Sequence, residues 1–206
     1  MGTRGVWGFR KDGYDKVSYC HFDSYPEGLG YSFAKLLMKP VAEKLDAWFD
    51  NIVEIDAEKL PTDEQKRYCI DMGWYNGNVS NRDANDWYCL LRELQDPERW
   101  EKLIDEDKKV FIDNKIDFIK DSLWCEYAYI YNIDKKELEI YDGFQEKPQE
   151  GNRYGTEQRK GHVCGYYPCR LAGKITLDEL QEFAEKYEEL AADYVVKRMN
   201  EIINGK

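Results

Sequence analysis

The 206-residue sequence contains few of the residues that common catalytic and metal-binding motifs require. Its only histidines are His21 and His162, so a multi-histidine metal site is excluded. P-loop hydrolases, dinucleotide-binding folds and α/β-hydrolases are unsupported, because the sequence has no Gly-x-x-x-x-Gly-Lys-Ser/Thr loop, no Gly-x-Gly-x-x-Gly turn and no Gly-x-Ser-x-Gly elbow. One metal-like spacing, His162-x-Cys164-x4-Cys169, lacks a nearby fourth ligand. We therefore expect neither a metal site nor a cofactor.

Basic residues are also scarce relative to acidic ones, at 30 against 41, which gives a net charge of −11. Binding to duplex nucleic acid or to an anionic membrane surface depends on a broad basic face, so we expect neither partner. No apolar run approaches the roughly 20 residues of a membrane span, and the N-terminus lacks the layout of a secretory signal. Six dispersed cysteines favour reduced thiols. These features predict a cytoplasmic location.

Aromatic residues are abundant, at 15% of the chain, and several alternate with polar residues in two predicted hairpins. The first hairpin joins residues 6–9 to residues 16–19 through an Asp-Gly step at Asp12, which is a strong turn signal. The second joins residues 124–131 to residues 137–141. We expect most of these aromatic side chains to fill a sheet face.

Helical periodicity is clearest in residues 31–56, which Pro40 should divide, and in residues 177–203. Capping boxes begin the latter helix at Thr176 and a shorter helix at Thr62. The fold predicted for residues 1–206 is a single α+β domain. Its largely antiparallel sheet is built from the N-terminal and 124–141 hairpins, and the two long helical stretches cover it.

The most informative cluster follows the second predicted strand. His21 and Asp23 lie two residues apart, so on a strand they would share a face. Two glycines then lead into a helix whose first amides would be free to bind an anion, and Arg4 on the neighbouring strand would supply a cation. The alternative interpretation is a structural turn, in which case the site should lie near Arg153, Tyr154 and the loop of residues 148–160. The candidate ligand-binding residues are Arg4, His21, Asp23, Tyr25, Gly28 and Gly30.

The opening Met-Gly-Thr-Arg-Gly and the Asp-Ser-Tyr-Pro-x-Gly-x-Gly segment that begins at Asp23 resemble a family of uncharacterised bacteriophage and bacterial proteins. Residues 124–129 and 138–141 are similar to a second stretch of its phage members. The resemblance implies a phage or bacterial source, and host cytoplasm as the location if the protein is phage-encoded. The family brings no established activity.

The layout is also remotely similar to that of N-terminal-nucleophile hydrolases, in which small residues begin the first strand and the second strand ends in an Asp. That similarity implies Thr3 as nucleophile and Asp23 as its helper. The match is incomplete, because removal of Met1 exposes Gly2, and Thr3 would need one further cleavage.

The sequence is compatible with three functions. The first is non-catalytic binding of a small, anionic, nucleotide-like ligand, through which a phage protein would sequester a host defence signal. The second is an amidohydrolase of the N-terminal-nucleophile type. The third is a protein-binding inhibitor, supported by the acidic residues of 178–201. Assembly into a homo-oligomer is compatible with all three.

Overall fold

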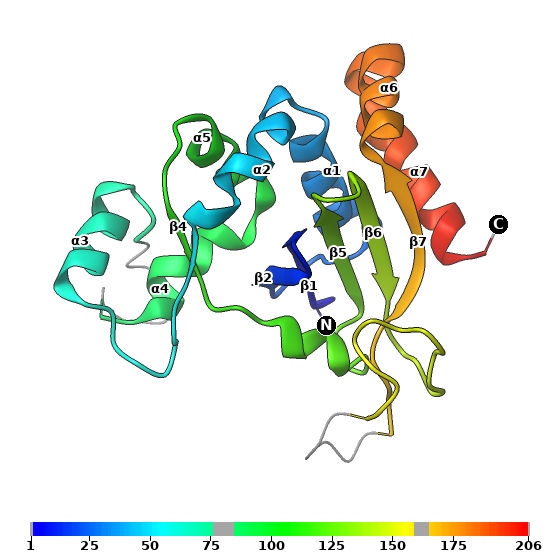
Figure 1. Ribbon diagram of the computed structural model, residues 1–206, viewed down its shortest axis with the longest axis horizontal. Coiled ribbons are helices and arrows are strands. Elements are labelled where there is room, and N and C mark those ends of the chain that lie inside the picture. The colour runs from blue at the N-terminus through cyan, green and yellow to red at the C-terminus, as the bar shows by residue number, and fades with distance from the viewer. Residues whose placement is uncertain (1, 76–84, 159–164, 206) are drawn as a thin grey trace.

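The computed structural model describes residues 2–75, 85–158 and 165–205. Its main feature is a five-stranded open sheet in the order β2-β1-β5-β6-β7 (Figure 1). Three of its four pairings are antiparallel, and β1 pairs with β5 in parallel. A smaller parallel sheet joins β3 and β4. The strands are β1 (Gly5–Lys11), β2 (Tyr14–Cys20), β3 (Ile52–Glu54), β4 (Val110–Ile112), β5 (Tyr127–Asn132), β6 (Glu137–Asp142) and β7 (Arg170–Thr176).

Seven α-helices lie within the described residues, together with several short 3₁₀ turns and one π-helical turn, η1 (Pro26–Gly30). The helices are α1 (Tyr31–Leu37), α2 (Leu45–Trp48), α3 (Asp63–Asp71), α4 (Trp87–Leu91), α5 (Trp100–Asp105), α6 (Leu177–Tyr187) and α7 (Ala191–Ile203). The 3₁₀ turns are η2 (Pro40–Lys44), η3 (Phe49–Asn51), η4 (Arg92–Gln95), η5 (Pro97–Arg99), η6 (Ile116–Lys120) and η7 (Glu188–Leu190). The predicted α+β class is confirmed.

Both predicted hairpins are present. In the first, Asp12 and Gly13 have φ angles of 51° and 80°, the left-handed conformation that a tight turn between twisted strands requires. In the second, β5 pairs with β6 from Tyr127 to Asn132, so the strand begins three residues later than expected. The two hairpins join through the parallel β1–β5 pairing.

The two long helical stretches are more divided than their periodicity indicates. The first is interrupted before Pro40 as predicted, but it ends at Asn51, and Ile52–Glu54 forms β3 instead of a last helical turn. The second is broken by η7 into α6 and α7, which pack against each other as a helical hairpin. Figure 1 shows α6 continuing directly from β7 and α7 running back along the sheet.

Large apolar side chains cover one face of the main sheet and form the larger core. Phe33 of α1 lies over Trp7 and Phe9, with ring centroids 5.1 and 5.5 Å apart, while α7 contacts β6 and β7. The opposite face carries a smaller core, in which Ile119 and Tyr154 pack over the strands. The strand residues of the larger core are Trp7, Phe9, Tyr129, Tyr131, Leu138, Ile140 and Ile175.

Three of the buried tryptophans donate hydrogen bonds to backbone carbonyls, and the bond from Trp7 connects β1 to the helical region. The indole N–H of Trp7 donates to the carbonyl oxygen of Gln95 at 2.9 Å, and that of Trp100 donates to Leu94 at 2.9 Å. Trp48 donates to Lys108 at 2.8 Å. Since each of these indoles has a partner, these residues add packing without leaving a polar group unsatisfied.

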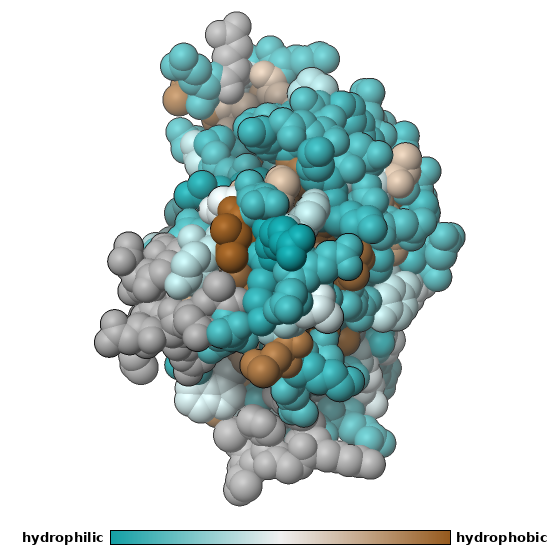
Figure 2. Space-filling view, turned by 90° about the vertical axis from the view of Figure 1, so that its left-hand side faces the viewer, coloured by the Kyte–Doolittle hydropathy of each residue, from teal (hydrophilic) through white to brown (hydrophobic). Residues whose placement is uncertain are grey.

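On the face that carries α3 and α4, apolar residues form small separate spots between hydrophilic ones (Figure 2). No helix in the described parts of the chain is long and apolar enough to cross a membrane.

Candidate functional site

The chain turns away from the sheet immediately after β2. The strand ends at Cys20, and Asp23 has a φ of 53°, so the alternation of a strand does not extend over this segment. The prediction that His21 and Asp23 share a strand face is therefore wrong. His21 instead exchanges a hydrogen bond with the hydroxyl of Tyr19, which lies 2.7 Å from its Nδ1 atom. Asp23 is exposed, and its carboxylate raises the pKa of Tyr25 through charge and hydrogen bonding.

The amides expected to be free for an anion already have partners. The amide of Gly28 donates to the carbonyl of Tyr25 at 3.0 Å, and that of Leu29 donates to the carbonyl of Asp23 at 2.8 Å. Gly30 also donates to Tyr25, at 3.4 Å. Helical structure begins at Pro26 rather than at the expected Tyr31, so these donors are consumed inside the turn.

Gly28 and Gly30 have structural reasons for lacking a side chain. A Cβ on Gly28 would lie 2.0 Å from the carbonyl oxygen of Asp23. A Cβ on Gly30 would lie 3.0 Å from the sulfur of Met199 and 3.1 Å from the ring of Tyr129. The close approach predicted at these glycines is to the protein's own chain, as the structural-turn alternative requires.

Arg4 and Thr3 flank this turn from the strand side. The Arg4 guanidinium lies 5.0 Å from the ring centroid of Trp124, and the Arg4 carbonyl accepts from the amide of Glu126 at 2.9 Å. The carbonyl of Thr3 accepts from the amide of buried Ser24 at 3.2 Å. Arg4 is thus held beside the start of β5.

Sequence reasoning missed a second arginine, Arg92, at the end of α4. Its guanidinium lies 5.4 Å from the ring centroids of both Phe22 and Tyr88. Its Nη1 atom is buried and has no hydrogen-bond partner among the described residues. One sequence signal was available, because Tyr88 and Arg92 are four residues apart and so share a helix face.

Gln95 fixes the position of Arg92 relative to the strands. Its carbonyl accepts from the indole of Trp7, and its side-chain oxygen accepts from the amide of His21 at 3.2 Å. One residue of η4 is therefore tied to β1 and to the end of β2. This double attachment places the end of α4 beside the turn that follows β2.

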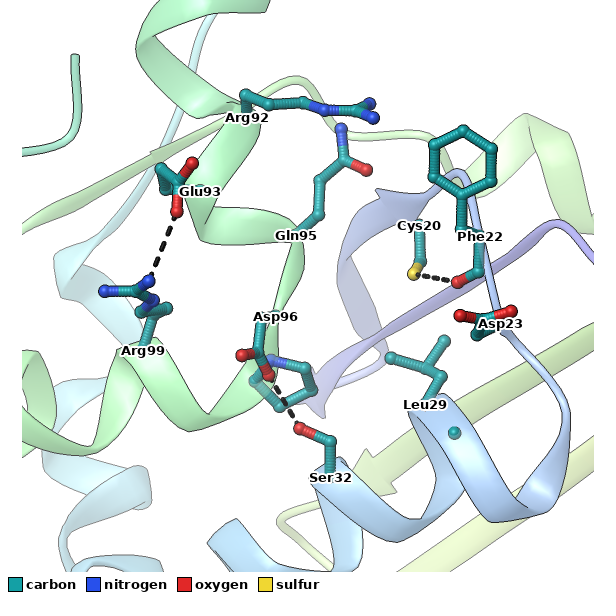
Figure 3. A pocket seen from close by; sticks show the side chains of 12 residues that line it. Cys20, Phe22, Asp23, Leu29, Ser32, Arg92, Glu93, Gln95, Asp96 and Arg99 are labelled. Atoms are coloured by element: carbon teal, nitrogen blue, oxygen red, sulfur yellow. Dashed lines mark hydrogen bonds and ion pairs between the residues drawn. The ribbon is translucent and has the colours of Figure 1, made fainter. Parts of the chain in front are cut away.

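A cleft of about 330 Å³ lies between that turn and the segment from α4 to η5. Figure 3 shows Arg92 reaching across its upper rim toward Phe22. Of the predicted ligand-binding residues, Asp23 and Gly28 line the cleft, whereas Arg4, His21, Tyr25 and Gly30 do not. The lining residues are Cys20, Phe22, Asp23, Gly28, Leu29, Ser32, Arg92, Glu93, Gln95, Asp96, Pro97 and Arg99.

Several acidic side chains of the cleft are bound by other groups. Asp96 accepts from the hydroxyl of Ser32 at 2.7 Å and from the amide of Glu98 at 3.1 Å. Glu93 pairs with Arg99 at 3.3 Å. Within the described residues no carboxylate forms an ion pair with Arg92. Of the acids that line the cleft, Glu93 is paired with a cation, Asp96 is held by neutral donors and Asp23 is exposed, while Arg92 has no carboxylate partner among the described residues.

Local electrostatics at His21 differ in sign from those of the protein as a whole. Burial lowers the pKa of His21, and the positive charges of Arg4 and Arg92 lower it further. Burial raises the pKa of the neighbouring Tyr19, so its hydroxyl stays protonated near neutral pH. The two arginines make the surroundings of His21 positive in a chain of net charge −11, and the lowered pKa keeps His21 itself neutral at neutral pH.

The other predicted location, around Arg153 and Tyr154, holds a buried charge network on the opposite sheet face. Arg153 pairs with Glu139 at 2.6 Å and with Asp15 at 3.5 Å, and it donates to the hydroxyl of Tyr154 at 2.7 Å. Arg10 also pairs with Asp15, at 2.5 Å. These charges satisfy one another, which is the pattern of a structural clamp.

In the described part of the chain no group of three or more His, Cys, Asp or Glu side chains could hold a metal ion. His162 and Cys164, two members of the metal-like spacing, lie outside the described residues. Cys169 is buried and donates from its thiol to the carbonyl of Cys125 at 3.2 Å.

Comparison with protein-family models, with curated proteins and with solved structures gave no match.

Proposed function

We propose that this protein binds a small anionic ligand that carries an aromatic ring, of the nucleotide class, in the cleft between the turn after β2 and the α4–η5 segment. The observation that carries this proposal is the environment of Arg92. Its buried Nη1 atom has no acceptor among the described residues, and its guanidinium lies against Phe22, whose side chain is 52% exposed.

The chemistry of these two side chains suits a phosphate joined to a planar base. A guanidinium presents paired donors that match phosphate oxygens, and it remains charged at any physiological pH. An exposed ring beside it offers a face on which a base stacks, with a contribution of about 1–3 kcal/mol. The cleft volume of about 330 Å³ lies within the range of small-molecule sites.

The overall charge of −11 favours a small ligand over a large polyanion. Long-range repulsion opposes a large polyanion, whereas a small anion experiences mainly the nearby guanidinium. If the chain is phage-encoded, as its resemblance implies, such a site would allow it to sequester a host nucleotide signal.

Calorimetric titration with adenosine 5′-monophosphate tests the proposal. We expect Arg92→Gln to weaken binding at least tenfold, because a hydrogen bond to a charged group contributes about 1.5–3 kcal/mol. The matched control is Arg67→Gln, which removes the same charge from an exposed position on α3, outside the cleft lining.

Binding that is unchanged in the control and lost in Arg92→Gln supports the proposal. Equal affinity in the two variants contradicts it. So does the absence of binding by the wild-type protein when all four common ribonucleoside monophosphates are tested.

A further inference from the structure

The proposed site has a neighbour with the same composition. Arg92 lies over Phe22, and Arg4 lies over Trp124, so two guanidiniums each contact an aromatic ring of the surface. We propose that these two pairs bind consecutive nucleotides, and that the ligand is a short single-stranded oligonucleotide of at least two residues. This inference rests on the proposed function and extends it from one nucleotide to two.

Both pairs offer a ring to the solvent. Trp124 is 43% exposed and Phe22 is 52% exposed, so part of each ring is accessible to a ligand. A third ring, Tyr88 at 41% exposure, contacts the other side of Arg92. Each of the two guanidiniums therefore lies beside at least one partly exposed ring.

Both cations are available to phosphates. Among the described residues neither guanidinium forms an ion pair with a carboxylate, although acidic residues outnumber basic ones in the chain. The side chain of Glu126 is close to Arg4, but its contact there is with the Arg4 backbone amide, at 3.4 Å. Two guanidiniums without carboxylate partners repel each other in the absence of anions, and the two phosphate groups of a 5′-phosphorylated dinucleotide, one beside each, would relieve that repulsion.

His21 connects the two pairs. Its ring meets Phe22 edge-on with centroids 4.4 Å apart, and the pairing of Gly5 with Cys20 puts Arg4 and His21 at the same end of the first hairpin. The two arginines therefore belong to one continuous surface and are not independent patches. A phosphodiester that runs from one pair to the other would pass beside the imidazole.

A repeated ring-and-cation unit matches a repeated base-and-phosphate ligand. A mononucleotide has one base and one phosphate group, and the pair of Phe22 and Arg92 is sufficient for both. A second pair gains binding energy only from a second nucleotide. Proteins that bind single strands use this arrangement of successive rings beside a line of cations, because each unpaired base exposes a face for stacking.

Duplex nucleic acid does not fit the same surface. Its bases are stacked on each other, so their faces are not available to Phe22 and Trp124. The net charge of −11 also opposes a long polyanion, since only two arginines favour it locally. The ligand should therefore be both unpaired and short.

The test compares thymidine 5′-monophosphate with the 5′-phosphorylated thymidine dinucleotide in calorimetric titrations of the whole chain. We expect the wild-type protein to bind the dinucleotide at least tenfold more tightly. In Arg4→Gln the affinities for the dinucleotide and the monophosphate should differ by less than twofold. In Arg92→Gln the binding of both ligands should be weaker. Arg67→Gln is the charge-matched control and should keep the wild-type ratio. Arg4→Lys should give an intermediate ratio, because it keeps the charge and loses the planar group that stacks on Trp124.

The results that would overturn this inference differ from those that would overturn the proposed function. Equal affinity for the two ligands in the wild-type protein overturns this inference and leaves the proposed function intact. A ratio that survives in Arg4→Gln overturns it as well, provided that the melting temperature shows the variant to be folded. A 12-base-pair duplex that binds as tightly as the dinucleotide contradicts the single-stranded assignment. If neither thymidine ligand nor any ribonucleotide binds, both proposals fail.

Discussion

Replacing Arg153 by Met should destabilise the protein strongly, although the residue lies far from the proposed site. In the wild-type protein Arg153 contacts both oxygens of Glu139, at 3.0 and 2.6 Å. The Glu139 side chain is only 3% exposed. Methionine keeps much of the aliphatic volume, but it leaves this carboxylate buried without a cation. Asp15 is affected less, because Arg10 remains beside it.

The magnitude follows from what Glu139 loses and keeps. Removing one partner of a buried ion pair costs about 3–5 kcal/mol. Glu139 keeps two neutral donors, the amide of Asn132 at 3.2 Å and the hydroxyl of Tyr141 at 2.9 Å. We therefore expect the lower end of that range, about 3 kcal/mol. For a chain of this size, the loss corresponds to a fall in melting temperature of about 6–12 °C.

Urea titration of Arg153→Met, Glu139→Gln and the double variant measures the coupling between the two side chains. The double variant carries no unpaired charge at this position, so it should be more stable than Arg153→Met alone by at least 1 kcal/mol, roughly the cost of an uncompensated buried group. A cost below about 1 kcal/mol for Arg153→Met, which is the size of a surface pair, would refute the clamp.

The pH dependence of the stability difference between the wild-type protein and Arg153→Met gives a second test of the ion pair. Burial alone would raise the pKa of Glu139, but the hydrogen bond and charge of Arg153 outweigh it and lower the pKa below the ordinary value of 4.5. In the wild-type protein, ionised Glu139 thus contributes to the free energy of unfolding at any pH above its pKa in the unfolded chain. This contribution is lost as the pH falls through the pKa of Glu139 in the folded protein. In Arg153→Met the folded pKa should lie above 4.5, so the stability difference between the two proteins should shrink as the pH falls from 7 to 4.

Two further predictions concern the turn after β2. Gly28→Ala should lower the free energy of unfolding by about 2 kcal/mol, because the new Cβ would collide with the carbonyl of Asp23. Urea titration measures this change, and a value below about 0.5 kcal/mol, the size of a neutral surface substitution, would contradict the prediction. Affinity for a thymidine dinucleotide without a terminal phosphate should rise as the pH falls from 7 to 5. The phosphodiester favours protonated His21, whose pKa in the free protein is lowered by burial and by the two arginines. Calorimetry of His21→Asn should show a flat profile, and a wild-type profile that is equally flat would exclude His21 from the site.

Features that depend on neighbouring residues were predictable from the sequence. The turn at Asp12 and Gly13 forms as expected, and so does the division of the helical stretch at Pro40. Thr62 and Gln65 form a full capping box, with distances of 3.2 and 2.8 Å between donors and acceptors. Each of these features is determined by a few consecutive residues, whose conformational preferences do not require the rest of the fold.

Features that depend on distant partners were not predictable. The parallel pairing of β1 with β5 joins residues from opposite halves of the chain, and no local pattern specifies it. The break between α6 and α7 contains neither proline nor glycine, and it depends on α7 packing back on α6 and on the sheet. Ile52–Glu54 continues a helical pattern but becomes a strand because β4 is available to pair with it.

In the candidate site too, features that depend on neighbouring residues were predictable and those that depend on distant partners were not. The predicted hairpin forms, and its register puts Arg4 and His21 at the same end, because Gly5 pairs with Cys20. Arg92 was missed because it reaches the turn only through the attachment of Gln95 to two strands. The glycines of the turn were interpreted as ligand contacts, whereas Gly28 and Gly30 meet the protein's own chain.

The place of β1 inside the sheet has a consequence for synthesis on the ribosome. The first hairpin emerges early, yet β1 needs β5 on its free edge, and its apolar side chains Trp7 and Phe9 are covered by residues made later. A two-stranded hairpin alone is marginally stable in water. The nascent chain must therefore carry β1 with one unpaired edge until β5 has left the exit tunnel, and during that interval it should be a substrate for chaperones that bind apolar segments.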